Sequence, residues 1–381
     1  MAIFYTMAAT ADLKYTTPVF KKNQPDDTYK FQPLPAPTGN SPYHLSLNDI
    51  QPVANQQQMM FQLVGDTGSV RNASFQRQVA GAMARQNLEA VSKEYQPLFL
   101  FHLGDVVYNF GEAEHYFSQF FEPYADYPNP IFAIAGNHDS DVNPASEVPY
   151  QSLDAFTSVF CDSVSQPVIF AKSSKRKSMV QPNIYWTLET PLANIIGLHS
   201  NVPKFGVITP EQRNWFIEEL KTANLERPGK AIIVCIHHAP YSADINHGSS
   251  IPMIEFLEGV FEETGIRPDI VFSGHVHNYQ RFNKRYADGV TVPYIVAGAG
   301  GYDELHPIAY LNDERFTGEN PLFDDVQLVH YCDNKHGFMK VTLEKTEAGL
   351  TLKGEYYSIA HEEQSAGITV AALDDSFVIK I

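Results

Sequence analysis

The chain has 381 residues, of which 44% are hydrophobic, so it is long enough to bury a sizeable core and has the ordinary composition of a globular protein. Its 44 Asp and Glu residues outnumber its 27 Lys and Arg residues, and the formal net charge of -17 argues against non-specific binding to nucleic acids or to anionic membranes. The three cysteines, Cys161, Cys235 and Cys332, are widely spaced and indicate neither a disulfide framework nor a cysteine-type zinc site.

The N-terminal region is predicted to be an irregular arm spanning residues 1–58. Residues 16–57 contain seven prolines and many Asn, Gln and Asp residues, a composition that favours turns and extended segments. The first residues, MAIFYTMAATADLKY, contain neither a basic segment nor a long apolar stretch, so we expect no signal peptide. Together with the cysteine usage this favours a cytoplasmic location. No stretch approaches 18 apolar residues, so no transmembrane helix is expected.

From residue 59 onward, short apolar runs bounded by turn residues alternate with helical segments, which is typical of buried strands and their connections. The predicted strands are 59–65, 98–103, 130–135, 193–198, 230–236, 269–273 and 293–297. Residues 74–95 have the apolar spacing of a helix. A second helix is predicted over 209–222, where Thr209 is the N-cap, Pro210 lies in the first turn and Gln212 completes a capping box.

The pattern changes beyond residue 335. The segments GFMKVTLEK, LTLKGEYYSIA and DSFVIKI alternate apolar and polar residues, which predicts antiparallel strands. The order of elements, βα units first and antiparallel strands last, predicts a single α/β domain over residues 59–381.

A basic segment, KSSKRKS at 172–178, stands out in this acidic chain. It has two interpretations. It is either a solvated surface loop or a basic arm that meets an anionic substrate or partner.

Five predicted strands are each followed by Asp, Asn or His. The segments are GDTG (65–68), GDVVY (104–108), GNHD (136–139), HHAPY (237–241) and GHVH (274–277). In open α/β sheets ligands bind at the carboxyl ends of the strands, so these residues can converge on one site.

The residue types at these strand ends suit a pair of metal ions. Carboxylate oxygens and imidazole nitrogens are ligands for zinc, iron and manganese. In an extended stretch residues two apart point the same way, so His275 and His277 can both face the site. The alternative for any one such Asp or His is a turn, cap or core residue, and we assign His102 and His199 to that class because neither has this setting. Five such strand ends in one chain favour a metal site.

The series GDTG, GDVVY, GNHD, VCIH and GHVH, in this order over residues 59–300, resembles the calcineurin-like metallophosphoesterase superfamily and looks most like its purple acid phosphatase branch. GHVHNYQR at 274–281 is a particularly close match. The resemblance implies an α/β fold, the metallophosphoesterase β-sandwich of two mixed sheets flanked by helices in four layers, α/β/β/α.

The resemblance also implies a binuclear metal centre. It assigns three side chains to the first metal, Asp66, Tyr108 and His277. It assigns three to the second metal, Asn137, His237 and His275, with Asp105 bridging the two. In this branch the first metal is Fe(III), and the second is Fe(II), Zn(II) or Mn(II).

The residue at position 68 indicates which branch of the superfamily the chain resembles. Many relatives in the superfamily have Asp-x-His at the first motif, whereas this chain has Asp66-Thr67-Gly68. Gly68 has no ligating atom, and Tyr108 is positioned to supply the missing ligand as a phenolate. This favours a ferric ion at the first position.

The fourth motif leaves two candidates. Val234-x-x-His237 fits the family pattern VxxH, whereas His238-Ala239-Pro240 satisfies the usual His-x-Pro. We favour His237 as the ligand, with His238 as its competitor. The third motif ends in Asp139, where plant enzymes usually have Glu.

The implied function is hydrolysis of small phosphomonoesters by attack of metal-bound hydroxide. Asp105 is expected to be essential as the bridge. His138 and His247 are the candidate proton donors to the leaving oxygen, because neither is assigned to a metal. His247 also occupies the place of a histidine that the family carries after its fourth motif. His138 has the alternative of bracing Asn137 or Asp105.

Two other functions remain open at this point. A phosphodiesterase acting on cyclic nucleotides or glycerophosphodiesters would use the same ligands. A non-catalytic, metal-stabilised binding protein is the remote alternative. No nucleic acid or membrane partner is expected, and the sequence does not predict the oligomeric state.

Overall fold

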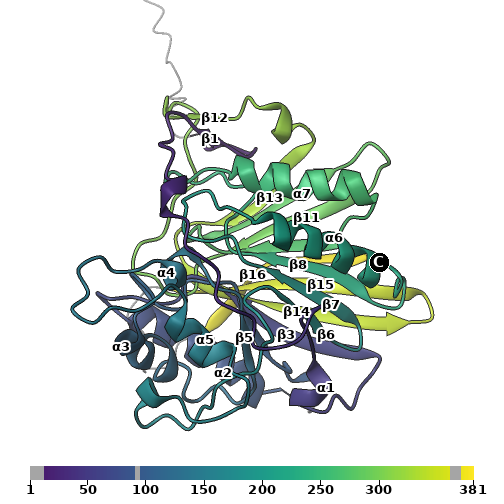
Figure 1. Ribbon diagram of the computed structural model, residues 1–381. Helices are drawn as coiled ribbons and strands as arrows, with labels where there is room; N and C mark the ends of the chain where they lie inside the picture. The colour runs from purple at the N-terminus through teal and green to yellow at the C-terminus, as the bar shows by residue number, and fades with distance from the viewer. Residues whose placement is uncertain (1–12, 91–94, 361–369) are drawn as a thin grey trace, which may run out of the picture.

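Two mixed β-sheets stack face to face in the computed structural model, which describes residues 13–90, 95–360 and 370–381 (Figure 1). The eight-stranded sheet has the order β13 (Val326–Cys332), β10 (Tyr279–Arg285), β11 (Thr291–Ala297), β9 (Ile270–Ser273), β8 (Ala231–Ile236), β7 (Ala193–Leu198), β6 (Trp186–Glu189), β2 (His44–Ser46). The six-stranded sheet has the order β16 (Ala371–Lys380), β15 (Gly349–Ile359), β14 (His336–Thr346), β3 (Gln58–Val64), β4 (Leu100–His102), β5 (Ile131–Ala133). A small pair joins β1 (Phe20–Lys21) to β12 (Phe316–Thr317).

Each sheet contains a run of neighbouring parallel strands. In the six-stranded sheet β3, β4 and β5 are parallel neighbours, and in the eight-stranded sheet β7, β8, β9 and β11 are. The carboxyl ends of parallel strands meet at one edge of a sheet, where ligands commonly bind. The last three strands, β14 to β16, form the predicted antiparallel ladder.

The space between the sheets is filled by apolar side chains from both inner faces. Phe61 stacks on Phe99 with ring centroids 4.9 Å apart, and Phe101 of one sheet stacks on Trp186 of the other at 6.0 Å. These large buried rings hold the two sheets together, since each buries 150–250 Å² of surface, roughly.

Helices cover both outer faces (Figure 1). The α-helices are α1 (Leu47–Ile50), α2 (Ser74–Leu88), α3 (Ala113–Tyr116), α4 (Asn137–Ser140), α5 (Asp154–Phe160), α6 (Pro210–Asn224) and α7 (Ile251–Thr264). Short 3₁₀ turns occur at Thr28–Lys30, Ile169–Ala171 and Pro321–Phe323, and one π-helical turn at Phe117–Phe121. Helices α6 and α7 pack on the eight-stranded sheet, and α2 and α5 pack on the six-stranded one. The predicted four-layer α/β/β/α sandwich is confirmed.

Local sequence signals explain where the helices begin. Thr209 accepts a hydrogen bond from the backbone N–H of Gln212 at 3.2 Å, so α6 starts at the predicted cap. The helix predicted over 74–95 ends at Leu88, and residues 91–94 of the predicted segment lie outside the described residues. Within the described part of the chain no helix is both long and apolar enough to cross a membrane.

The described part of the arm, residues 13–58, is mostly extended but not wholly irregular. It contains β1, β2 and α1, and β2 extends the eight-stranded sheet by pairing with β6. Strand β2 was not predicted, because its three residues, HLS, are too few to show a periodicity.

An ion pair fixes β2 to the sheet. Nε2 of His44 lies 2.7 Å from Oε2 of Glu219 in α6, and Nδ1 lies 2.8 Å from Oε1 of Glu189. The Glu219 side chain is only 4% exposed and also accepts a hydrogen bond from Thr187. The hydrogen bond to Glu219 raises the pKa of His44 above its usual value, although burial opposes this.

This pair predicts a pH-dependent stability. Because the folded-state pKa of His44 exceeds the unfolded value, the stabilisation is complete below about pH 6.5 and is lost as the pH rises through the folded pKa. His44→Gln is expected to lower the free energy of unfolding by about 1–2 kcal/mol at pH 6 and by less at pH 9. Urea unfolding of both proteins at the two pH values measures this, and an equal loss at both would contradict the assignment.

Candidate metal centre

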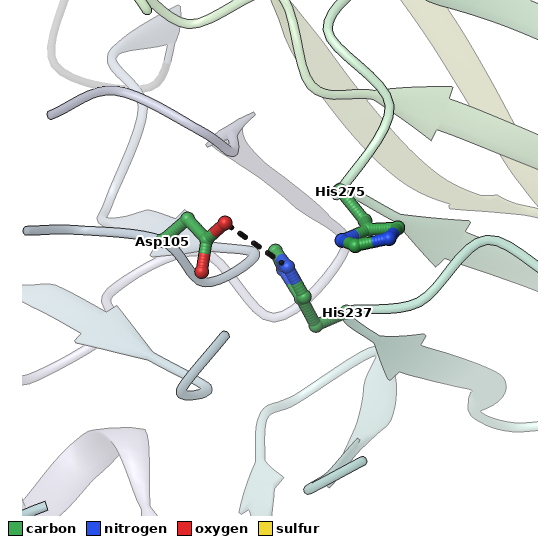
Figure 2. Close-up of side chains that lie close together, drawn as sticks. All are labelled: Asp105, His237 and His275. Atoms are coloured by element: carbon green, nitrogen blue, oxygen red, sulfur yellow. Dashed lines mark ion pairs between the residues drawn. The ribbon is translucent and has the colours of Figure 1, made fainter. Parts of the chain in front are cut away.

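The chemically active side chains lie where strands of the two sheets end. The six-stranded sheet supplies three at the ends of β3, β4 and β5: Asp66, Asp105 and Asn137. The eight-stranded sheet supplies three after β8 and β9: His237, His275 and His277. Figure 2 shows Asp105, His237 and His275 side by side, although they come from different sheets.

Three of the predicted ligands form a first group. The Tyr108 hydroxyl lies 3.3 Å from Oδ1 of Asp66 and 3.2 Å from Nε2 of His277. The same His277 nitrogen lies 3.7 Å from Oδ1 of Asp66. All three side chains are buried, with Asp66 and Tyr108 fully inaccessible and His277 7% exposed.

Three more form a second group around Asn137. Its Oδ1 lies 3.1 Å from Nε2 of His237 and 2.9 Å from Nδ1 of His275. Asp105 lies between the groups, with Oδ2 3.4 Å from Nε2 of His237 (Figure 2) and its carboxylate close enough to Tyr108 to raise the pKa of that phenol.

Backbone carbonyls orient two of the imidazoles. Nδ1 of His237 donates to the carbonyl of Leu103 at 2.8 Å, and Nδ1 of His277 donates to the carbonyl of Glu304 at 3.0 Å. With Nδ1 protonated, the lone pair on Nε2 faces the carboxylates, as it does in histidines that bind metals.

Consecutive histidines of the fourth motif point to different surroundings. His237 contacts Asp105 and Asn137, whereas Nδ1 of His238 bonds to Oγ of Ser200 at 2.7 Å. The structure therefore brings His237, and not His238, to Asp105 and Asn137.

The backbone at three of these positions is strained. Asp66, Asp105 and His275 have φ values of 58°, 53° and 67°, in the left-handed region that only a few per cent of non-glycine residues adopt, roughly, although Asn, Asp and His do so more often than others. Each such residue costs on the order of 1–3 kcal/mol and is characteristic of functional sites. Neighbouring glycines leave room for the carboxylates. A Cβ at Gly274 would lie 2.6 Å from Oδ2 of Asp66, and one at Gly136 would overlap Oδ1 of Asp105.

Gly68 and Tyr108 are sterically linked. A Cβ at position 68 would lie 3.0 Å from Cδ2 of the Tyr108 ring and would overlap Oε1 of Gln119. Gln119 in turn holds the Tyr108 backbone, accepting from its N–H at 2.8 Å and donating to its carbonyl at 2.8 Å. The absence of a side chain at 68 is therefore what lets Tyr108 reach Asp66.

The pKa shifts in this cluster indicate unbalanced negative charge. Burial, reinforced by Asp105 although opposed by His237, raises the pKa of Asp66 well above its usual value. Burial and the two carboxylates raise the pKa of Tyr108 well above its usual value. Burial alone would lower the pKa of His237, but Asp105 and Asp66 raise it to about 9. A bound cation would relieve all three effects, since it stabilises ionised carboxylates and phenolate.

The donor set fits metal ions. Two ligand atoms about 2.1 Å from one metal and separated by about 100° lie roughly 3.2 Å apart. The spacings of 3.3, 3.2 and 3.7 Å in the first group and 3.1 and 2.9 Å in the second lie near this value. Burial and neighbouring histidines lower the pKa of His275 and of His277 well below the usual value, which keeps both imidazoles neutral and able to ligate.

The two candidate proton donors flank this cluster. The backbone N–H of His138 donates to Oδ1 of Asp105 at 2.8 Å, and its Nδ1 bonds to the carbonyl of Asn109 at 2.8 Å. The His247 ring lies 4.1 Å from that of His275, and its Nδ1 has no hydrogen-bond partner among the described residues.

Two supporting residues were not predicted from the sequence. Asp244 accepts hydrogen bonds from the backbone N–H groups of Asn246, His247 and Gly248 at 2.9, 3.0 and 2.9 Å, which builds the turn that carries His247. His306 stacks on His277 with ring centroids 4.2 Å apart. Both lie in loops without a periodic pattern, and the only available signal was their residue type.

Three other polar residues support the strand ends. Asp139 accepts from the backbone N–H of Val107 at 3.0 Å and of Gly136 at 2.9 Å, linking the turns of the second and third motifs. Nε2 of His102 bonds to Oγ1 of Thr67 at 2.9 Å, and burial lowers its pKa to about 3. Burial and His237 lower the pKa of His199 to about 4.

The basic segment 172–178 lies elsewhere. The Arg176 guanidinium donates to the backbone carbonyls of Tyr124, Tyr127 and Asn129 at 3.2, 2.6 and 3.1 Å. Asn129 precedes β5, so this contact is at the opposite end of that strand from Asn137. Arg176 therefore has a packing role, and it does not reach the ligand cluster.

Comparisons with known proteins agree with this geometry. Residues 59–279, more than half of the chain, match the family model of the calcineurin-like phosphoesterases. Purple acid phosphatase 21 of Arabidopsis thaliana is 30% identical over 138 residues, which cover 34% of this chain and only 29% of that protein. Tartrate-resistant acid phosphatase type 5 of Oryctolagus cuniculus is 25% identical over 268 residues, 64% of this chain and 73% of that protein.

Two solved structures have a similar fold. One is described as GAP50, the anchor in the inner membrane complex of Plasmodium, with a TM-score of 0.50 and 14% identity over 84% of this chain and 90% of its own. The other is PhoD, with a TM-score of 0.50 and 15% identity over 91% of this chain and 71% of its own. At these identities the likeness concerns the fold alone.

Proposed function

The chain belongs to the calcineurin-like phosphoesterase family, and on that basis we propose that it hydrolyses small phosphate monoesters at a binuclear metal centre. The observation that carries this proposal is that two buried groups of candidate metal ligands lie on either side of Asp105. The Asp105 carboxylate interacts with Tyr108 of the first group and with His237 of the second. The similarity to acid phosphatases in two kingdoms supports the choice of monoesters.

Each of the two groups of side chains described above is proposed to bind one metal ion. Asp66, Tyr108 and His277 would hold Fe(III), a Lewis acid strong enough to ionise a phenol whose pKa is raised by burial, Asp105 and Asp66. Asn137, His237 and His275 would hold Fe(II), Zn(II) or Mn(II), and Asp105 would contribute to both. Such ions lower the pKa of coordinated water and neutralise charge on a phosphoryl group.

The chain's own residues supply orientation and protons. His138 and His247 are the proposed donors to the leaving oxygen. The unpartnered Nδ1 of His247 supports its role, because a buried ring nitrogen gains a partner when a substrate oxygen arrives. The Asp244 turn holds His247 against His275, so the ring does not need to be ordered when substrate binds.

A paired assay tests the proposal. The metal-loaded protein is expected to hydrolyse 4-nitrophenyl phosphate with a kcat/KM at least about tenfold above that for bis(4-nitrophenyl) phosphate, because a monoester offers more charge to the two cations. A preference for the diester would make the protein a phosphodiesterase. Two bound metals without turnover of either substrate would indicate a metal-stabilised binding protein.

A further inference from the structure

Two lysines from distant segments meet at one backbone oxygen beside the proposed centre. Nζ of Lys21, in β1, donates to the carbonyl of Asn246 at 2.7 Å, and Nζ of Lys204 lies 3.4 Å from the same oxygen. Both side chains are partly exposed.

Backbone contacts fix the positions of both lysines. Val19 pairs with the turn segment through its N–H to the carbonyl of Ser242 and its carbonyl to the N–H of Ser249, both at 2.8 Å. The backbone N–H of Lys204 donates to the Asp27 carboxylate at 3.1 and 3.2 Å. The two ammonium groups are therefore brought together by the fold of the arm and its partners.

Neither ammonium group has a carboxylate partner in the described part of the chain. The nearby Asp27 carboxylate binds the Lys204 backbone and lies 3.6 Å from the ammonium of Lys30. Burial lowers the pKa of Lys204, and the charge of Lys21 adds to this effect. Asp244 and Asp27 attract the Lys204 ammonium and Asp313 interacts with that of Lys21, but among the described residues none of these carboxylates forms an ion pair with either nitrogen. An added anion bridging the two like charges would therefore stabilise both.

The lysines are one residue from the proposed proton donor. Asn246, whose carbonyl they share, directly precedes His247, and the His247 ring contacts that of His275 at 4.1 Å. The shared carbonyl therefore places both ammonium groups beside the turn that carries His247.

We propose that Lys21 and Lys204 bind a second anionic group of the substrate, a phosphate or carboxylate beyond the ester that is cleaved. Lysine is a common phosphate ligand and acts as a point charge. This inference rests on the proposed function, because it names the substrate class of the same site: phosphate esters that carry a second anion.

A matched pair of substrates tests this on the metal-loaded protein. Glycerol 3-phosphate and 3-phosphoglycerate share a leaving group region but differ in one carboxylate. The wild type is expected to have a KM about tenfold lower for 3-phosphoglycerate. The double variant Lys21→Gln, Lys204→Gln should raise that KM about tenfold, while kcat changes little and the KM for glycerol 3-phosphate changes less than about twofold. Lys22→Gln, an exposed neighbour whose side chain contacts neither Asn246 nor His247, should change neither KM.

Calorimetry gives a readout that does not depend on turnover. Inorganic pyrophosphate should bind the wild-type holoprotein more tightly than inorganic phosphate, and the double variant should lose this preference. Equal KM changes for both substrates, or an unchanged preference for pyrophosphate, would overturn the inference. If the wild type hydrolyses neither ester, the proposed function fails while the pyrophosphate comparison still decides the lysine pair.

Discussion

Replacing Asp105 by asparagine is expected to lower phosphate-ester hydrolysis by at least about 1,000-fold and to remove at least one metal ion per chain. The reason is its position. Oδ1 of Asp105 accepts from the backbone of His138, Oδ2 faces Nε2 of His237, and the carboxylate also lies close enough to Tyr108 to raise its pKa. A neutral amide keeps the shape of the side chain but supplies no charge to either ion.

The measurement is metal content and kcat on the same preparation, with thermal unfolding as a check on folding. Asp126→Asn, which removes an exposed carboxylate, is the matched control and should behave like the wild type. An Asp105→Asn protein that retains two ions and normal turnover would contradict the bridging role.

Tyr108→Phe is expected to abolish the visible absorption of the oxidised, iron-loaded protein. The phenol oxygen lies 3.3 Å from Oδ1 of Asp66 and 3.2 Å from Nε2 of His277, so it is the donor in the first group that can form a tyrosinate. Phenylalanine fills the same volume without this oxygen, so the variant should fold and lose only the tyrosinate-to-iron transition.

A second tyrosine provides the control. The Tyr302 ring packs 4.5 Å from that of Tyr108 and 4.4 Å from that of His277, but its hydroxyl forms no hydrogen bond to Asp66. Tyr302→Phe should therefore retain the band. If the band survives Tyr108→Phe and disappears in Tyr302→Phe, the iron-bound phenolate is that of Tyr302. If the iron-loaded wild type shows no band, the first metal is not ferric iron bound by tyrosinate.

Much of this site could be predicted because it is encoded locally. All seven strands predicted over residues 59–297 occur within two residues of their expected bounds, since each is an apolar run closed by glycine, proline or a polar turn. The side chain after each strand then falls at the carboxyl edge of its sheet. The choice between His237 and His238 was harder, because consecutive residues of an extended chain point to opposite sides and only the register of β8 decides which one faces Asp105.

The residues that the sequence did not reveal act through long-range contacts. Asp244 and His306 lie in loops, and Lys21 reaches Asn246 across 225 positions of the chain. No local periodicity records such a contact, because it depends on how the arm crosses the sheet. Helix α7 is different: its cap Ser250 and its terminal Gly265, at φ 68°, are local signals that sequence reasoning could have used.

Phosphate-ester hydrolysis by this protein is proposed to require two metal ions at the cluster around Asp105. The most direct measurement is the hydrolysis rate of 4-nitrophenyl phosphate during stepwise addition of metal to metal-free protein, with the bound metal determined at each step. We predict negligible activity without metal and a maximum when two ions are bound per chain. Full activity in the metal-free protein, or saturation with two ions and no release of phosphate, would rule out a two-metal phosphatase.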